Sequence, residues 1–310
     1  MTLMTREQLL AQLAQGESFQ QSELSHIDLN GTSLDDAIFI GAYLRGANFS
    51  EASCQKTNFT HANLMFANFT AANLAQAILF RAEFNSACLN QAKLIRANAT
   101  KGKFYSASLC DVEASLAVFQ QADLREAQIN NADLSNTNLE KAQLSQANFA
   151  NINFNRANLR QIRAIATNFN HLIGQSIDLE KANLSNSEIS ESDLQRANLL
   201  NANLSGAKLN AVNLQNAELL ESIFKQAKLT NVDLTSASLF AANLEGSHLT
   251  QVNLTAANLQ DANLENTHWN NVNLADSNVF NAVFTGAQGL SRKQCEWLLE
   301  QGALNVPSSS

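Results

Sequence analysis

The sequence has little of what most functional classes require. Only 15% of its 310 residues are charged, and no run of 18 apolar residues exists, which argues against a membrane span within it. It contains no Gly-rich loop followed by Lys-Ser/Thr and no G-x-G-x-x-G motif, so the common nucleoside-phosphate sites are missing. Disorder does not explain the low charge, because Leu and Phe are plentiful.

Other features that the sequence lacks bear on where the protein is located and on which partners it binds. The first residues do not combine a basic start, an apolar core and a small-residue cleavage site, so we expect a cytoplasmic protein. The formal net charge is −8 and no basic aromatic platform is present, so we expect no direct binding of nucleic acid. Four cysteines form no C-x-x-C pair and are expected to be reduced and incidental: Cys54, Cys88, Cys110 and Cys295.

Asparagine, by contrast, is abundant, with 40 residues spread along the whole chain. Its amide competes for the local backbone, so Asn is depleted in the interiors of helices and strands. A chain with this much Asn therefore needs a special backbone that accommodates it.

The abundant residues follow a period of five. Of the 54 positions from Phe19 to Phe284 whose number ends in 4 or 9, 45 are Leu or Phe. Two residues before these positions stands Ala at 31 of the 54, and Ser, Thr or Val at most of the others, and one residue before stands Asn or Asp most often. The unit is A-(N/D)-(L/F)-x-x, and its register does not slip.

A period of five fits neither the 3.6 residues of an α-helix nor the alternation of a simple strand. The small residue and the Leu or Phe are two apart, so they share one side of an extended segment, and the backbone must turn before the next unit. Short extended pieces separated by bends give a coil with flat sides. Four sides would make a coil of 20 residues, with coils stacked about 4.8 Å apart.

Runs such as Ala182-Asn183-Leu184 and Ala242-Asn243-Leu244 resemble the pentapeptide-repeat proteins, which are numerous in bacteria and cyanobacteria. The resemblance covers residues 17–286. It implies an all-β fold, a right-handed quadrilateral β-helix of about 13.5 coils, with the Leu/Phe centre and the small residue facing inward.

Both ends of the repeat region carry expected caps. Thr5-Arg6-Glu7-Gln8 reads as a capping box that opens a helix within residues 1–16, carrying Leu9, Leu10 and Leu13 and ending at Gly16. Ser291-Arg292-Lys293-Gln294 opens a second helix within residues 287–304, with Trp297, Leu298 and Leu299 before Gly302. Such caps cover the apolar core and strand edges that a solenoid otherwise exposes. Residues 305–310 read as a loose tail.

Departures from the pattern suggest a core of conserved volume. Where the centre residue is small, the residue two positions earlier is large, as for Leu172 before Gly174 and Ile162 before Ala164. Ala97 and Ala99 are both small, so we expect a thin spot there or a neighbour that leans in.

Candidate chemistry is sparse, and we expect no enzyme, no cofactor and no metal. His248 and His268 lie 20 apart and should stack on adjacent coils, but two imidazoles do not complete a zinc site. A tightly filled solenoid offers no obvious pocket with convergent polar groups.

One column of outward positions is apolar, which often marks a partner surface. It directly follows the centres Phe19, Phe39, Phe59 and their equivalents, and the candidate partner-binding residues in it are Ile40, Phe80, Leu200, Leu220, Phe240 and Phe280. The alternative is that these side chains lie flat along the coils, as isolated surface hydrophobics commonly do.

Charge is uneven as well. Between residues 230 and 285 there are five acids and no Lys or Arg, namely Asp233, Glu245, Asp261, Glu265 and Asp276. Some pentapeptide-repeat proteins inhibit or protect DNA gyrase, so the resemblance implies that an acidic coil surface could imitate duplex DNA. Five acids are sparse beside the phosphates of DNA, which place one charge per about 1.7 Å of axis.

Two functions follow from these features. The favoured one is a rigid scaffold for protein–protein interaction with an unknown protein partner, or with a second copy through the apolar column or the C-terminal cap. The alternative is a DNA mimic that binds DNA gyrase or a related topoisomerase. No membrane partner is expected.

Overall fold

The structure is a computed structural model that describes residues 4–308. These residues form two compact units, divided after Asn158. Residues 1–3 of the expected N-terminal cap and residues 309–310 of the expected tail lie outside the described residues.

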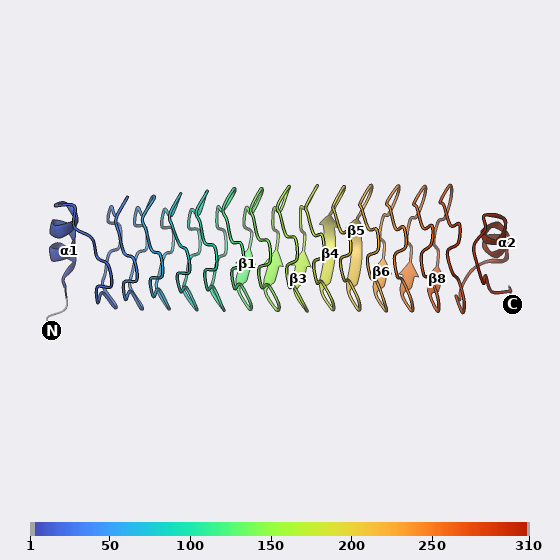
Figure 1. Cartoon of the computed structure of the whole chain (residues 1–310), viewed down its shortest axis with the longest axis horizontal. Helices are drawn as coiled ribbons and strands as arrows, with labels where there is room; N and C mark the ends of the chain where they lie inside the picture. The colour runs from blue at the N-terminus through green and yellow to red at the C-terminus, as the bar shows by residue number, and fades with distance from the viewer. Residues whose placement is uncertain (1–3, 309–310) are drawn as a thin grey trace. The chain divides into compact units, whose positions relative to one another are not determined.

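The N-terminal unit begins with a helix, and similar coils follow it, drawn from blue to green in Figure 1. Parallel bridges join residues 20 apart throughout, such as Glu23 with Tyr43 and Tyr43 with Asn63. Two of these segments are long enough to count as strands, and they pair in the same register. The elements of this unit are α1 (Arg6–Leu13), β1 (Gln128–Asn130) and β2 (Asn148–Ala150).

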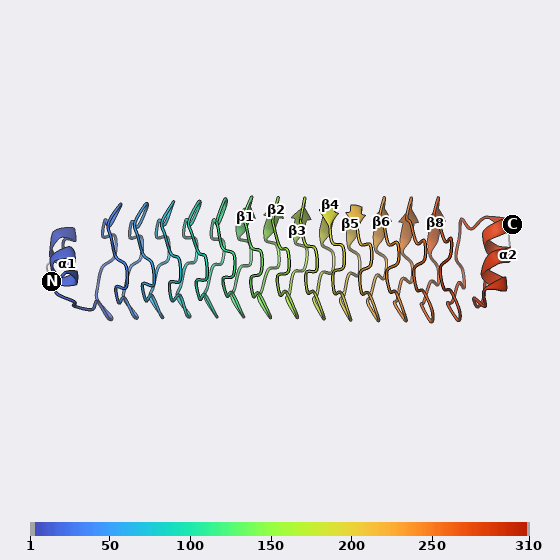
Figure 2. The same ribbon diagram turned by 90° about the horizontal axis from the view of Figure 1, so that it is seen from above.

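The C-terminal unit repeats this architecture with more regular strands, which lie along one side of the coils (Figure 2). Strands β3 to β8 pair in chain order, all parallel and all shifted by 20 residues. The elements are β3 (Asn168–Asn170), β4 (Glu188–Asp193), β5 (Lys208–Asn213), β6 (Lys228–Thr230), β7 (His248–Thr250), β8 (His268–Asn270) and α2 (Arg292–Glu300). Four pentapeptide sides complete each coil, so the predicted quadrilateral β-helix is confirmed.

Four of the five backbone amides in a pentapeptide have backbone partners, as residues 199–203 illustrate. The amides of Leu199 and Asn201 donate to carbonyls of the next coil, and that of Asn203 donates to the preceding coil. The amide of Ala202 donates to the Leu199 carbonyl across the turn, and all four bonds measure 2.7–3.0 Å. The fifth amide, that of Leu200, has no carbonyl partner in this ladder.

Asparagine supplies that missing partner. The Leu200 amide donates to Oδ1 of Asn198 at 3.1 Å, and Nδ2 of Asn198 donates to Asp178 on the preceding coil at 3.0 Å. The same hydrogen bond recurs where the Thr60 amide donates to Asn58 Oδ1 and the Glu265 amide donates to Asn263 Oδ1. The Asn side chains thus bond both to neighbouring coils and to the turn backbone. The abundance of Asn follows, because an unpaired, partly buried N–H is costly.

Every turn places one residue in the left-handed region. All residues from Gln21 to Gly286 whose number ends in 1 or 6 have a positive φ, although only six of them are glycine. This conformation and the hydrogen bond across the turn are typical of type II turns, which favour Gly or Asn at this position. Phe66 and Leu116 adopt it too, with φ of 60° and 63°, which is unusual for bulky side chains.

Phenylalanine fills much of the N-terminal core. Rings on successive coils stack, with Phe39 and Phe59 centroids 5.4 Å apart and Phe49 and Phe69 centroids 4.5 Å apart. Rings on adjacent sides meet edge to face, as Phe49 and Phe59 do at 88°. The core of the C-terminal unit consists mainly of leucine and alanine.

The irregular core positions are filled by neighbours, as expected. A Cβ on Gly174 would lie 2.7 Å from a methyl of Leu172 and 2.9 Å from a methyl of Leu194, so both side chains lean into the vacant centre slot. The apolar void that remains there is about 10 Å³, too small and too apolar for a stable water. Near Ala99, the Phe104 ring lies where a side chain on Gly102 would stand.

Both predicted capping boxes form. Thr5 and Gln8 exchange hydrogen bonds at the start of α1, as do Ser291 and Gln294 at the start of α2. Leu9 and Leu298 are fully buried against their own units. The chain beyond α2 differs from expectation, because Leu304 pairs with Val283 and Asn305 donates to Thr285 Oγ1 at 3.2 Å. The expected loose tail is therefore held at its first residue.

Replacing Asn198 with Ala should lower the free energy of unfolding by about 1 kcal/mol, since the Leu200 amide loses its acceptor. Chemical denaturation followed by circular dichroism measures this. The control is Gln195→Ala, an outward change in the same coil at a side chain without hydrogen bonds among the described residues. Equal effects of the two changes would show that the hydrogen bond from the Leu200 amide to Asn198 contributes nothing to stability.

Replacing Gly289 with Ala should be more damaging than replacing Gly16. Both glycines have φ near 80°, so both variants carry the left-handed strain of about 1 kcal/mol. Only at Gly289 would the new Cβ clash, at 2.0 Å from the Trp269 carbonyl oxygen, whereas Gly16 has open space. Thermal unfolding of the two variants compares them, and a melting temperature equally lowered in both would refute the clash.

Candidate interaction surfaces

The predicted apolar column is only partly exposed. Five of its members are half-buried, namely Ile40 and Phe80 in the N-terminal unit and Leu200, Leu220 and Phe240 in the C-terminal unit. Phe280 is 52% exposed, and its ring lies over Gly302 beyond α2. These side chains thus partly cover neighbouring backbone and still present apolar surface.

Three column members of the C-terminal unit lie on successive coils. The bridges from Asn198 to Glu218 and from Glu218 to Ser238 set the register that places Leu200, Leu220 and Phe240 in line. Within residues 198–201, 218–221, 238–241, 258–261 and 278–281 of this side, the acids are Glu218, Glu221 and Asp261, and there is no Lys or Arg. The carboxylates of Glu218 and Glu221 therefore border the apolar column, and Lys181 on the preceding coil of this side is paired with Glu180.

The acidic stretch is partly committed to internal contacts. Burial pushes the pKa of Asp233 upward, but hydrogen bonds from Thr235, Gln215 and Asn253 outweigh it and hold that pKa below its ordinary value. Glu245 forms an ion pair with Lys225 of the preceding coil, with 2.8 Å between Oε2 and Nζ.

The other predicted acids, Asp261, Glu265 and Asp276, are exposed or half-exposed. Glu265 follows Glu245 in the same column, as expected, but Lys225 occupies that column on the coil before Glu245. The carboxylates free to imitate phosphates are thus fewer than the sequence suggested.

His248 and His268 stack as predicted, with ring centroids 4.4 Å apart and planes 14° from parallel. Partial burial, followed by the nearby His268 and Lys228, lowers the pKa of His248 below its ordinary value. Among the described residues, no three or more His, Cys, Asp or Glu side chains group as metal ligands would.

The depressed pKa of His248 predicts an acid-sensitive fold. The folded chain binds fewer protons than the unfolded chain, so stability is lost as the pH falls through the ordinary His value near 6.5 towards the folded pKa. The melting temperature should therefore fall more between about pH 7.5 and about pH 5 in the wild type than in His248→Gln. Carboxylate effects are common to both proteins, and parallel decreases would rule out this origin.

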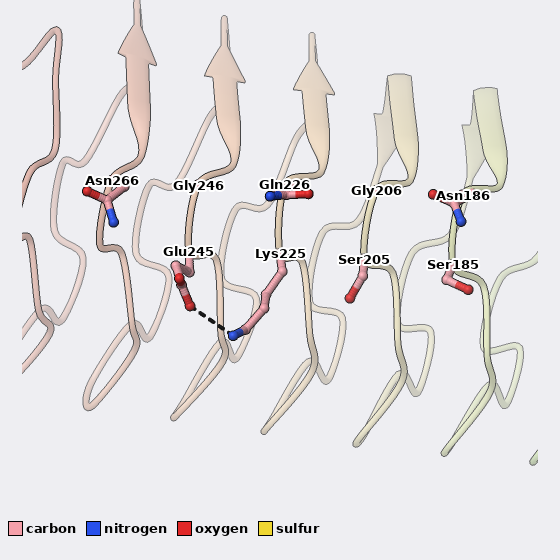
Figure 3. Close-up of a pocket in the computed structure, with 9 residues that line it drawn as sticks. All are labelled: Ser185, Asn186, Ser205, Gly206, Lys225, Gln226, Glu245, Gly246 and Asn266. Carbon is pink, nitrogen blue, oxygen red and sulfur yellow. Dashed lines mark ion pairs between the residues drawn. The ribbon is translucent and has the colours of Figure 1, made fainter.

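A polar groove not anticipated from the sequence runs along one corner of the C-terminal unit (Figure 3). Its volume is about 560 Å³, and its residues are Ser185, Asn186, Ser205, Gly206, Lys225, Gln226, Glu245, Gly246 and Asn266. Glycines alternate with amides along the turn positions, and the missing side chains of Gly206 and Gly246 open the groove. The alternation of Gly with Asn or Gln every 20 residues is the sequence signal that could have identified it.

Exposed aromatic side chains of the N-terminal unit also escaped the sequence reasoning. Tyr43 and Phe66 are each 51% exposed, and Tyr105 is 38% exposed. Arginines lie over two of these rings, with Arg45 4.5 Å from the Phe66 centroid and Arg125 5.8 Å from the Tyr105 centroid. We call these five residues the aromatic–arginine patch. They were missed because they occupy slots other than the apolar column.

The cysteines are structurally ordinary. Cys54 and Cys295 are buried, while Cys88 and Cys110 are half-buried, and all four are free thiols. Burial, with a smaller effect of Asp35, raises the pKa of the Cys54 thiol well above its usual range. Because the thiolate is the reactive form, Cys54 is an inert core residue.

A family comparison agrees with this geometry. The family of pentapeptide repeats matches almost the whole repeat region, in segments that run from residues 18–50 to residues 257–288. The chain therefore belongs to the pentapeptide-repeat family. No curated protein sequence matches the chain.

Several solved structures are similar. HetL of the cyanobacterium Nostoc sp. PCC 7120, described as involved in heterocyst differentiation regulation, is 24% identical over 91% of this chain and 97% of its own, with a TM-score of 0.34. The plasmid-mediated fluoroquinolone resistance protein QnrB1 is 19% identical over 56% of this chain and 89% of its own, with a TM-score of 0.41. Rfr23 of Cyanothece 51142 is 36% identical over 31% of this chain and 58% of its own, with a TM-score of 0.25. In residues 4–308, no helix is long and apolar enough to cross a membrane.

Proposed function

We propose that the chain is a non-enzymatic scaffold that presents the apolar column to a protein partner. The observation that carries the proposal is the line of Leu200, Leu220 and Phe240 on successive coils of the C-terminal unit. Each is half-buried, so each is held in place before a partner arrives, and little side-chain entropy is lost on binding. Their carboxylate border matches the usual arrangement of an apolar centre within a polar rim.

The packed interior supports a binding role over catalysis. Leu, Phe and Ala fill the inward slots, and the thiol among them is inert. The cytoplasmic location expected from the sequence stays a prediction. A second copy remains a candidate partner alongside an unrelated protein.

The DNA-mimic alternative has weaker support. It needs unpaired carboxylates arranged along a surface, and Asp233 and Glu245 already have internal partners. We retain DNA gyrase as the specific bait that would test it, with the exposed Asp261 and Asp276 and the half-exposed Glu265 as its candidate contacts.

Changing Leu200, Leu220 and Phe240 together to Ser should abolish capture of protein partners in a pull-down and leave the fold intact. The matched control replaces Asn210, Thr230 and Thr250 with Ser. These residues also directly follow a centre residue, two sides further along each coil. Circular dichroism checks the fold of both variants. If the column variant captures partners as well as the wild type does, the column is not the binding surface. If the column variant still captures gyrase, and a second variant with Asp261→Asn and Glu265→Gln does not, the DNA mimic is favoured.

A further inference from the structure

The aromatic–arginine patch has the composition of a binding surface. Aromatic side chains and arginine are enriched at interfaces, where they dominate the binding energy. Tyr43 and Arg45 both project outward from one side, since they are two positions apart in an extended segment, with the inward Leu44 between them. Phe66 stands at the following corner one coil further on, under the Arg45 guanidinium. Arg45 and Phe66 are therefore in direct contact, and Tyr43 lies outward on the same side as Arg45.

The fold does not require Phe66. Its backbone is left-handed, with φ of 60°, at a position where Gly or Asn would be less strained. Its ring is half-exposed and contributes nothing to the core. A residue that strains the backbone and exposes apolar surface is unfavourable for the isolated chain, so a role outside the fold accounts for it better.

The coils that carry the centre of this patch are basic. Residues 37–107 hold seven Lys and Arg and only two acids, Glu51 and Glu83, which gives a formal charge of +5 in a chain whose total is −8. Glu83 is paired with Lys103 at 2.7 Å. Arg45 makes no ion pair among the described residues, so its charge is available to an incoming carboxylate.

The apolar column of the C-terminal unit is complementary to this patch in both respects. It offers aliphatic and aromatic surface at Leu200, Leu220 and Phe240, and the carboxylates of Glu218 and Glu221 lie at its border. Lys181, on the preceding coil, is already paired with Glu180. Opposite charges around matched apolar surfaces favour association and set its register.

We propose that the aromatic–arginine patch of one copy docks on the apolar column of a second copy, with Arg45 facing Glu221. This rests on the proposed function, because it uses the same column and names its partner. Two such contacts would close a two-fold dimer, and a single contact would extend into an open chain of copies.

Sedimentation velocity of the full chain tests the proposal. The wild type should self-associate, and association should weaken as NaCl rises from roughly 0.05 M to 0.5 M, because the charges become screened. Arg45→Glu should weaken association about tenfold or more, as expected for a central arginine. The matched control is Arg96→Glu, the same charge change on another corner of the same basic coils, which should leave association unchanged.

Two further variants separate docking from folding. Phe66→Asn should also weaken association but leave the melting temperature equal or higher, because Asn tolerates the left-handed turn. A mixture of the Arg45→Glu variant and the Glu221→Arg variant should associate again, because each contact then joins opposite charges, whereas each variant alone should associate only weakly.

A wild type that stays monomeric at all concentrations and salts overturns the docking. So does an Arg45→Glu variant that associates like Arg96→Glu. If the column variant loses capture of another protein while the wild type is monomeric, the scaffold role stands and only self-association fails.

Discussion

The fold depends on one backbone amide in each pentapeptide. A turn after every third extended residue leaves four amides with carbonyl partners and one, on the first residue after the centre, with none. Where Asn or Asp stands two residues earlier, its side-chain oxygen accepts from this amide, and in many coils the Asn side-chain nitrogen then donates to the coil before. Because the acceptor must stand at this one slot, an inserted residue would leave an amide unpaired in its own coil and shift the slot for the next.

This constraint determines what the rest of each unit can vary. Once the amides are paired, the ladder holds the second turn residue at positive φ whatever its side chain, so Arg, Lys, Glu and even Phe66 occupy a conformation usually left to Gly or Asn. The inward slots are fixed by packing, as Gly174 shows, where two leucines move in to replace the missing centre. Freedom of sequence is left to the outward slots.

The sequence was accordingly a good guide to the fold and a poorer guide to its surfaces. The register and the stacking of His248 on His268 follow from a strict period of 20, and the capping boxes follow from local Thr/Ser-x-x-Gln motifs, so each could be predicted. Half-burial of the apolar column could not, because it depends on how far each side chain lies against the next coil. The Lys225–Glu245 pair was missed because the acidic stretch was bounded by sequence number, and Lys225 lies outside it.

The surfaces that remain informative are those where a residue is worse for the fold than its alternatives. Asn one residue before the centre and Ala two residues before it are explained by the structure of the coil, so they carry no information about a partner. Phe66 is different, because Asn would relax its turn and remove exposed apolar area. Leu200, Leu220 and Phe240 are intermediate, since a polar residue at the same slot is accepted on another side of the same coils, at Asn210, Thr230 and Thr250. These preferences are the reason for proposing the column and the patch, rather than the regular Asn ladders, as binding surfaces, because the ladders are explained by the fold itself.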